Sequence, residues 1–74
     1  MARKYHMLFV RDDKNNWTPQ FGDYDRHTVI EEMGDSYADV PKADIVILPL
    51  PNARQSTCDH AVRSLNKLGK NIRL

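Results

Sequence analysis

The sequence predicts an α+β fold with the element order ββαβα, in which two helices lie on one face of a three-stranded sheet with strand order 2-1-3. Three observations predict this two-layer arrangement. Two short apolar segments are separated by turn-forming residues, two segments have helical periodicity, and a third apolar segment lies between them. Seventy-four residues without a repeat or a linker are expected to form one domain, 1–74.

The first two strands are expected to form a hairpin. Lys4 to Arg11 has apolar residues on both alternating faces, as in a central strand. Residues 12–16 are rich in turn formers and connect it to a second strand from Trp17 to Phe21. Pro19 cannot donate a backbone hydrogen bond, which places the second strand at an edge of the sheet.

The first helix is expected to begin after Asp25, a suitable N-cap residue, and to end near Tyr37. Gly22 permits the sharp exit from the preceding strand. One helix face is apolar and the opposite face is acidic. The apolar residues are Val29, Ile30, Met33 and Tyr37, and the acidic ones are Glu31, Glu32, Asp35 and Asp39.

The third strand and the second helix follow. Four consecutive aliphatic residues predict a buried strand over Ile45 to Leu50, limited by prolines. Asn52 and Gln55 have the spacing of a capping box that starts the second helix, and Gly69 is suited to end it. Residues 71–74 are compatible with either a tail or a short edge strand. The apolar side of this helix holds Cys58, Ala61, Val62, Leu65 and Leu68, and the opposite side holds Arg63, Lys67 and Lys70.

Helices on one face would leave the other face of the sheet uncovered. Because the first and third strands are apolar on both sides, we expect an exposed apolar face, and such faces usually mark interfaces. The candidate protein-interface residues are His6, Leu8, Val10, Val46, Leu48 and Trp17. Whether Trp17 lies in the core or on the surface is left open.

The composition is that of an ordinary globular domain, with 41% hydrophobic and 28% charged residues. A single cysteine provides no disulfide framework and favours a reducing compartment. No apolar run approaches the roughly 20 residues that span a bilayer, and no secretory signal is recognisable. We therefore expect a cytoplasmic protein with no membrane partner.

The charges are segregated along the chain. Residues 1–11 hold three bases, residues 12–44 hold nine acids against three bases, and residues 45–74 hold five bases against one acid. The net charge of +1 argues against unspecific affinity for nucleic acid. A small basic surface formed by Arg54, Arg63, Lys67 and Lys70 nevertheless makes nucleic-acid binding the alternative hypothesis.

Catalytic and metal sites are not predicted. Cys58 and His60 are two positions apart on a helix, so their side chains diverge, and a buried structural thiol is the favoured interpretation. The three histidines lack the spacing of a metal pair. We expect no cofactor and no enzymatic activity.

The aromatic residues Trp17, Phe21 and Tyr24 have two interpretations. They could form a platform on which nucleic-acid bases stack. The favoured interpretation is core packing, with Trp17 and Phe21 on the same side of their strand and beneath the helices.

The block Phe21 to Asp25, preceded by Trp17, resembles small hypothetical proteins encoded by bacteriophages and prophages. The resemblance extends from about Lys4 to Leu68, with Lys4-Tyr5-His6, Arg11-Asp12, Ala61-Val62 and Leu65-Asn66 as further points of similarity. It implies an accessory role in the host cytoplasm. The leading hypothesis is a protein-interaction module that binds a host or phage protein, or forms a homodimer, through the uncovered sheet face or its edge.

Overall fold

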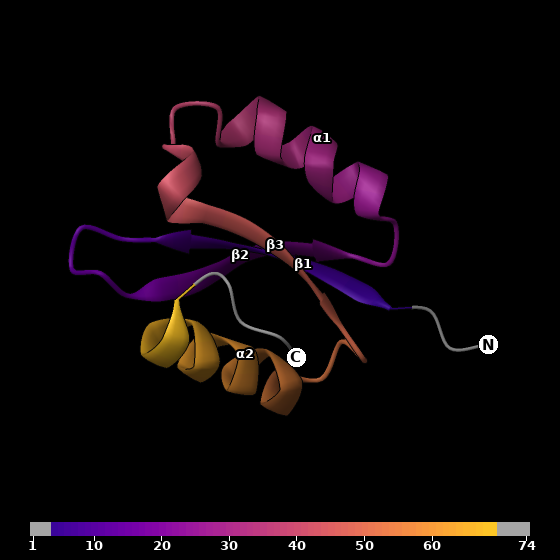
Figure 1. Ribbon diagram of the computed structural model, residues 1–74. Helices are drawn as coiled ribbons and strands as arrows, with labels where there is room; N and C mark the ends of the chain where they lie inside the picture. Colours follow the sequence, from indigo (N-terminus) through magenta and orange to yellow (C-terminus); the bar gives the residue numbers. More distant parts are fainter. Residues whose placement is uncertain (1–3, 70–74) are drawn as a thin grey trace.

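The computed structural model describes residues 4–69 and places a three-stranded sheet between two helices (Figure 1). The strand order is β2-β1-β3, and β1 pairs antiparallel with both neighbours. The α+β class and the strand order are thus confirmed. Along the chain the elements are β1 (Tyr5–Arg11), β2 (Trp17–Asp23), α1 (Arg26–Ser36), the short 3-10 helix η1 (Lys42–Asp44), β3 (Ile45–Leu50) and α2 (Gln55–Leu68).

The two helices cover opposite faces of the sheet, so the prediction that both lie on one face is wrong (Figure 1). Leu8 of β1 packs in a cluster with Val29 of α1, whereas the next residue, Phe9, packs in a cluster with Leu65 of α2. Successive residues of a strand point to opposite faces. Because both faces are apolar, both must be shielded from water, and the fold has three layers rather than two.

Each face therefore has its own apolar cluster. The α1-side core consists of buried Leu8, Val29 and Ile45 with half-buried Val10, Phe21, Met33, Tyr37, Val40 and Ile47. The α2-side core consists of buried Phe9, Trp17, Leu48, Leu50, Cys58, Ala61 and Leu65 with half-buried Met7, Val46 and Val62. The central strand β1 contributes to both clusters.

A β-bulge in β2 decides which core receives each aromatic residue. Leu8 is opposite Phe21 and Phe9 is opposite Pro19, so Gln20 is an additional residue in β2. The extra residue reverses the alternation, and Trp17 joins the α2-side core while Phe21 joins the α1-side core. The expectation that they share a side is therefore wrong. Tyr37 is the C-cap residue of α1, and its hydroxyl donates a 3.3 Å hydrogen bond to Gln20 Oε1 at the bulge.

The helix termini agree partly with the sequence. Asp25 caps α1 as predicted, because its side chain accepts a 3.0 Å hydrogen bond from the backbone N–H of His27. Gly69, at a φ of 82°, ends α2 as predicted. The predicted capping box is wrong, since α2 begins at Gln55 and Arg54 is its N-cap residue. Asn52 instead accepts hydrogen bonds from the backbone N–H of Arg54 at 3.0 Å and from the Thr57 hydroxyl at 2.6 Å.

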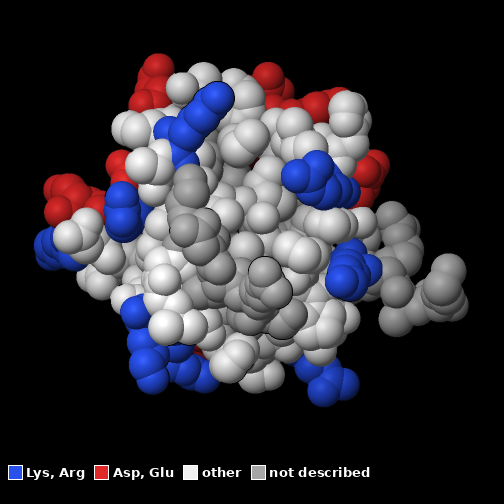
Figure 2. All heavy atoms as spheres, viewed as in Figure 1, with Lys and Arg blue, Asp and Glu red and all other residues white. Residues whose placement is uncertain are grey.

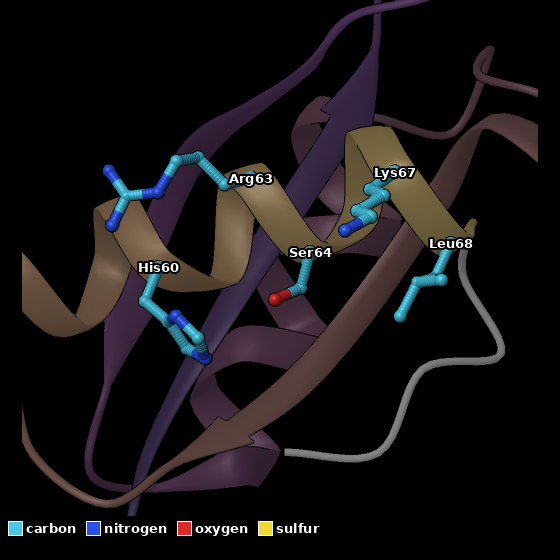
Figure 3. Close-up of a pocket in the computed structure, with 5 residues that line it drawn as sticks. All are labelled: His60, Arg63, Ser64, Lys67 and Leu68. Atoms are coloured by element: carbon cyan, nitrogen blue, oxygen red, sulfur yellow. The ribbon is translucent and has the colours of Figure 1, made fainter.

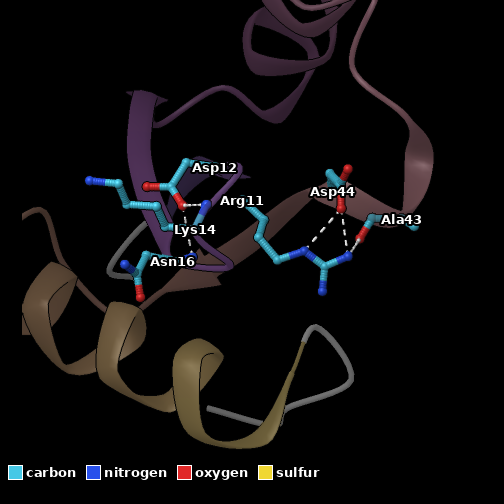
Figure 4. Close-up of polar contacts among 6 residues, drawn as sticks. All are labelled: Arg11, Asp12, Lys14, Asn16, Ala43 and Asp44. Atoms are coloured by element: carbon cyan, nitrogen blue, oxygen red, sulfur yellow. Dashed lines mark hydrogen bonds and ion pairs between the residues drawn. The ribbon is translucent and has the colours of Figure 1, made fainter.

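Arg11 joins three elements at one end of the sheet (Figure 4). Its Nε donates a 2.9 Å hydrogen bond to Asp44 Oδ1, and its Nη2 forms an ion pair with the same oxygen. The guanidinium also lies 5.4 Å from the ring centre of Trp17. The backbone N–H of Trp17 donates a 2.7 Å hydrogen bond to Asn66 Oδ1 of α2. The hairpin, the end of η1 and the last turns of α2 are thereby connected.

The turn between β1 and β2 is organised by one carboxylate (Figure 4). Asp12 Oδ1 accepts hydrogen bonds from the backbone N–H groups of Lys14 and Asn16, both at 2.9 Å. Asn15 adopts a left-handed conformation at a φ of 66°, which asparagine tolerates well. This turn connects the two strands of the hairpin at residues 12–16, as the sequence predicts.

Gly22 is required by a close approach of the Tyr5 ring. A Cβ at position 22 would lie 2.5 Å from the Tyr5 hydroxyl oxygen. The Tyr5 ring in turn makes an edge-to-face contact with Tyr24, with ring centres 4.9 Å apart. The glycine therefore provides room for an aromatic pair at the end of β2.

We expect Gly22→Ala to lower the free energy of unfolding by about 1 kcal/mol or more, because Tyr5 must move away from the new methyl group. Denaturant unfolding measures the change. Gly34→Ala is the matched control: among the described residues no atom outside the local helix backbone lies within 4 Å of a Cβ there. Alanine in that helix should raise stability by about 0.5–1 kcal/mol. Equal effects of the two substitutions would contradict this account.

Candidate functional site

The predicted interface residues do not form an exposed face. Leu8 and Val10 belong to the α1-side core, and Trp17, Val46 and Leu48 belong to the α2-side core. Trp17 is only 3% exposed, which settles its place in the core. His6 is half-buried on β1. The sheet within residues 4–69 thus has no uncovered apolar face of the kind the sequence suggested.

The edges of the sheet are poorly suited to pairing with another strand. Within the described chain, β2 and β3 each pair only with β1, so each is an edge strand. Each holds one exposed proline, Pro19 in β2 and Pro49 in β3. Proline lacks the N–H that a neighbouring strand would bind, and natural sheets use it to prevent edge-to-edge association. The outer surfaces of the helices are therefore better candidates than the sheet.

The outer side of α2 forms a hollow of about 430 Å³ (Figure 3). We call its lining the α2 surface: His60, Arg63, Ser64, Lys67 and Leu68. His60, Ser64 and Leu68 follow one another at four-residue spacing, and Arg63 and Lys67 form the adjacent row. The opposite side of the helix is held in the α2-side core by Cys58, Ala61 and Leu65. The amphipathic pattern of α2 thus fixes the direction in which the α2 surface faces.

Leu68 is the unusual member of the α2 surface because 68% of the residue is exposed. The sequence placed it on the buried side, and this expectation is wrong. At about 100° per residue, Leu68 lies about 60° around the helix from buried Leu65, toward Ser64. A leucine at this margin, in the last turn and beside a lysine, is the sequence signal that could have identified the surface.

The two helix surfaces have opposite charge. Residues 26–39, which include α1, hold four acids and one arginine, whereas residues 54–67 hold three bases and one acid. Figure 2 shows the Asp and Glu side chains mainly toward the α1 side of the view, whereas Lys and Arg side chains occur on both sides. Because α1 and α2 lie on opposite faces of the sheet, the acidic residues of α1 and the basic residues of α2 lie on opposite sides of the described chain.

The predicted basic residues are brought together only in part. Arg63 and Lys67 are exposed neighbours on the α2 surface. Arg54 precedes Arg63 by nine residues, which places it about 13 Å away along the helix axis and about half a turn around it. Lys70 lies outside the described residues. The predicted aromatic platform is absent from residues 4–69, because Trp17 and Phe21 are on opposite sides of the sheet.

Within the described part of the chain, no three His, Cys, Asp or Glu side chains are grouped so that they could hold a metal ion. In the same range, neither helix combines the length and apolar character needed to cross a membrane. Cys58 is a free thiol buried in the α2-side core. Burial, with a smaller contribution from the negative charge of Asp59, raises the pKa of the Cys58 thiol.

We expect Cys58 to react with a thiol reagent such as DTNB much more slowly in the folded chain than in denaturant. Burial limits access, and the raised pKa makes the reactive thiolate scarcer. The thiol also contributes a pH dependence to stability. Its share of the free energy of unfolding is full below the ordinary thiol pKa of about 8.5 and is lost as the pH rises through the higher folded-state pKa.

Cys58→Ala is the control for this pH dependence, since it removes the titrating group. Its unfolding free energy should fall less steeply above pH ~8.5 than that of the unmodified chain. Equal reaction rates of the thiol in the folded and unfolded states would contradict the burial of Cys58.

Comparison of the chain with models of protein families, with curated proteins and with solved structures found no match.

Proposed function

We propose that this protein is a small protein-interaction module that binds an acidic surface of another protein through the α2 surface. The observation that carries the proposal is Leu68, exposed beside Arg63 and Lys67 in a hollow of the helix exterior. The sequence predicted protein binding through a face of the sheet. The function proposed here is again protein binding, but the binding surface lies on α2.

An apolar residue surrounded by polar and cationic groups matches the anatomy of protein interfaces, which have an apolar centre and a polar rim. Full burial of a leucine side chain is worth about 1.5–3 kcal/mol, so a partner that covers Leu68 gains binding energy from it. Arg63 and Lys67 attract negative charge over a distance of about 10 Å at moderate salt and orient the approaching partner. Ser64 and His60 add groups that can form hydrogen bonds.

Nucleic-acid binding is the second candidate function, supported by the exposed pair Arg63 and Lys67 with Ser64 in the adjacent row of the helix. Two cations that each neutralise one phosphate would give a logarithmic salt slope of only about −2. The buried Trp17 offers no stacking surface. The exposed Leu68 has no role in contacts with phosphate, so the protein partner is favoured.

The proposed biological setting is an accessory role in a host cytoplasm. The motive for this proposal is the resemblance to phage-encoded proteins that the sequence suggests around Phe21 to Asp25. A binding function rather than catalysis is proposed because Leu68 is exposed beside two cations and because Cys58, the sole thiol in the chain, is buried.

We expect the double variant Arg63→Glu/Lys67→Glu to lose binding to a fluorescent peptide of alternating Glu and Leu by about tenfold or more, because attraction becomes repulsion. Fluorescence anisotropy at low and high salt measures the change. The neutral variant Arg63→Gln/Lys67→Gln should lose less. Leu68→Ala should weaken binding with little change in its salt dependence, since it removes apolar contact and no charge.

Arg26→Glu is the matched charge control, because Arg26 is exposed in the first turn of α1 on the opposite face of the molecule. A glutamate there suits the helix dipole, so the variant should fold and retain peptide binding. Peptide binding that is unchanged by the Arg63 and Lys67 substitutions would refute the proposal. Preferential binding of a DNA or RNA oligonucleotide, lost in the same variants, would favour the second candidate.

A further inference from the structure

We propose that protonation of His60 strengthens the binding of an acidic partner to the α2 surface, so that the affinity rises as the pH falls from about 8 to about 5.5. The inference rests on the proposed function and names how the same surface is regulated. His60 lines the same hollow as Arg63 and Lys67. Histidine is the side chain whose charge ordinarily changes between about pH 5 and 8, so protonation would add a third positive charge to this lining.

The spacing of the lining residues allows one partner to contact both His60 and Leu68. The side chains of His60, Ser64 and Leu68 extend from the same side of α2 (Figure 3). The eight positions from His60 to Leu68 correspond to about 12 Å along the helix axis. An extended peptide advances about 3.3 Å per residue. A partner segment with an apolar residue on Leu68 can therefore place a carboxylate three or four residues away beside His60.

The surroundings of His60 differ from those of the other two histidines. His27 of α1 forms an ion pair with Glu31 at 2.9 Å. His6 of β1 is half-buried, and its buried Nδ1 has no hydrogen-bond partner among the described residues. His60 is exposed, and within residues 4–69 its ring has no hydrogen-bond or ion-pair partner. An acidic group that approaches from outside thus meets an imidazole that the described chain has not already paired.

The described part of α2 supplies no carboxylate to the hollow. Asp59 precedes His60, but at about 100° per residue it lies on a different side of the helix. Its carboxylate accepts a 2.9 Å hydrogen bond from Gln55, one turn earlier. The charged residues that do line the hollow, Arg63 and Lys67, are both cationic. A proton on His60 therefore adds to the positive charge of the lining instead of being offset there by an acid.

The strands beneath α2 also leave the hollow without a carboxylate. α2 packs against β2 and β3, and its core includes residues of β1. β3 contains no titratable residue. The titratable residues of β1 and β2 are Tyr5, His6, Arg11 and Asp23, and none of them lines the hollow. Negative charge near His60 must then come from a bound partner.

Protonation and binding are coupled thermodynamically. A carboxylate that binds beside His60 favours the charged imidazolium over the neutral ring. By reciprocity, protonation of His60 strengthens the binding of that carboxylate by the same factor. The ordinary pKa of a glutamate side chain is about 4.3, so an acidic partner keeps most of its charge at pH 5.5. The affinity should therefore increase toward acidic pH and not decrease.

Fluorescence anisotropy with the Glu and Leu peptide at pH 8 and at pH 5.5, both at low salt, tests the coupling. We expect the unmodified chain to bind about two- to fivefold more tightly at pH 5.5, which is the size of one exposed ion pair. His60→Gln is neutral at both pH values and should lose this difference. His60→Lys is charged at both, so it should also lose the difference and should bind at pH 8 about as tightly as the unmodified chain does at pH 5.5.

His27→Gln is the matched control, because His27 is exposed on α1, on the opposite face of the sheet. This variant should keep the pH dependence of binding, and circular dichroism at both pH values verifies that each chain is folded. Equal affinity of the unmodified chain at the two pH values, or a pH dependence that persists in His60→Gln, would overturn the inference and leave the proposed function standing. If the peptide binds at neither pH, both fail.

Discussion

The structure depends on one constraint, which is that the central strand is apolar on both of its faces. Leu8 and Phe9 are adjacent in β1 and are fully buried on opposite sides of the sheet. A chain with two helices can satisfy both residues only by placing one helix on each side. Two features follow from this requirement: α2 lies on the face opposite α1, and within residues 4–69 neither face of the sheet is bare.

Two irregular features make the three-layer arrangement possible in a short chain. The bulge at Gln20 sends Trp17 to one core and Phe21 to the other, so β2 supplies a large side chain to each face. Arg11 then covers the Trp17 ring and bonds to Asp44, the last residue of η1 before β3. Both features increase the apolar surface that is buried. A domain of this size needs this increase, because small domains bury only a modest share of their surface.

Sequence reasoning succeeded for two local signals at helix ends, failed for a third, the capping box at Asn52, and failed where the outcome depends on distant residues. The cap at Asp25 and the stop at Gly69 depend on a few neighbouring residues, and both were correct. The face that α2 covers depends on the direction taken by residues 51–54, which have no pattern that specifies it. The bulge was missed because the residues around Gln20 are compatible with regular alternation, and Leu68 was misplaced because it lies at the margin of an apolar stripe.

The way in which the α2-side core is covered has a consequence for aggregation. Phe9, Leu48 and Leu50 are shielded from water by a single helix that follows a four-residue connection and is anchored near its far end by the bond from Trp17 to Asn66. Transient detachment of α2 would expose the apolar face of the sheet on that side, while the β1–β2 hairpin remained intact. This partly open species is the form most prone to self-association. The docked helix α2 therefore protects the chain against aggregation.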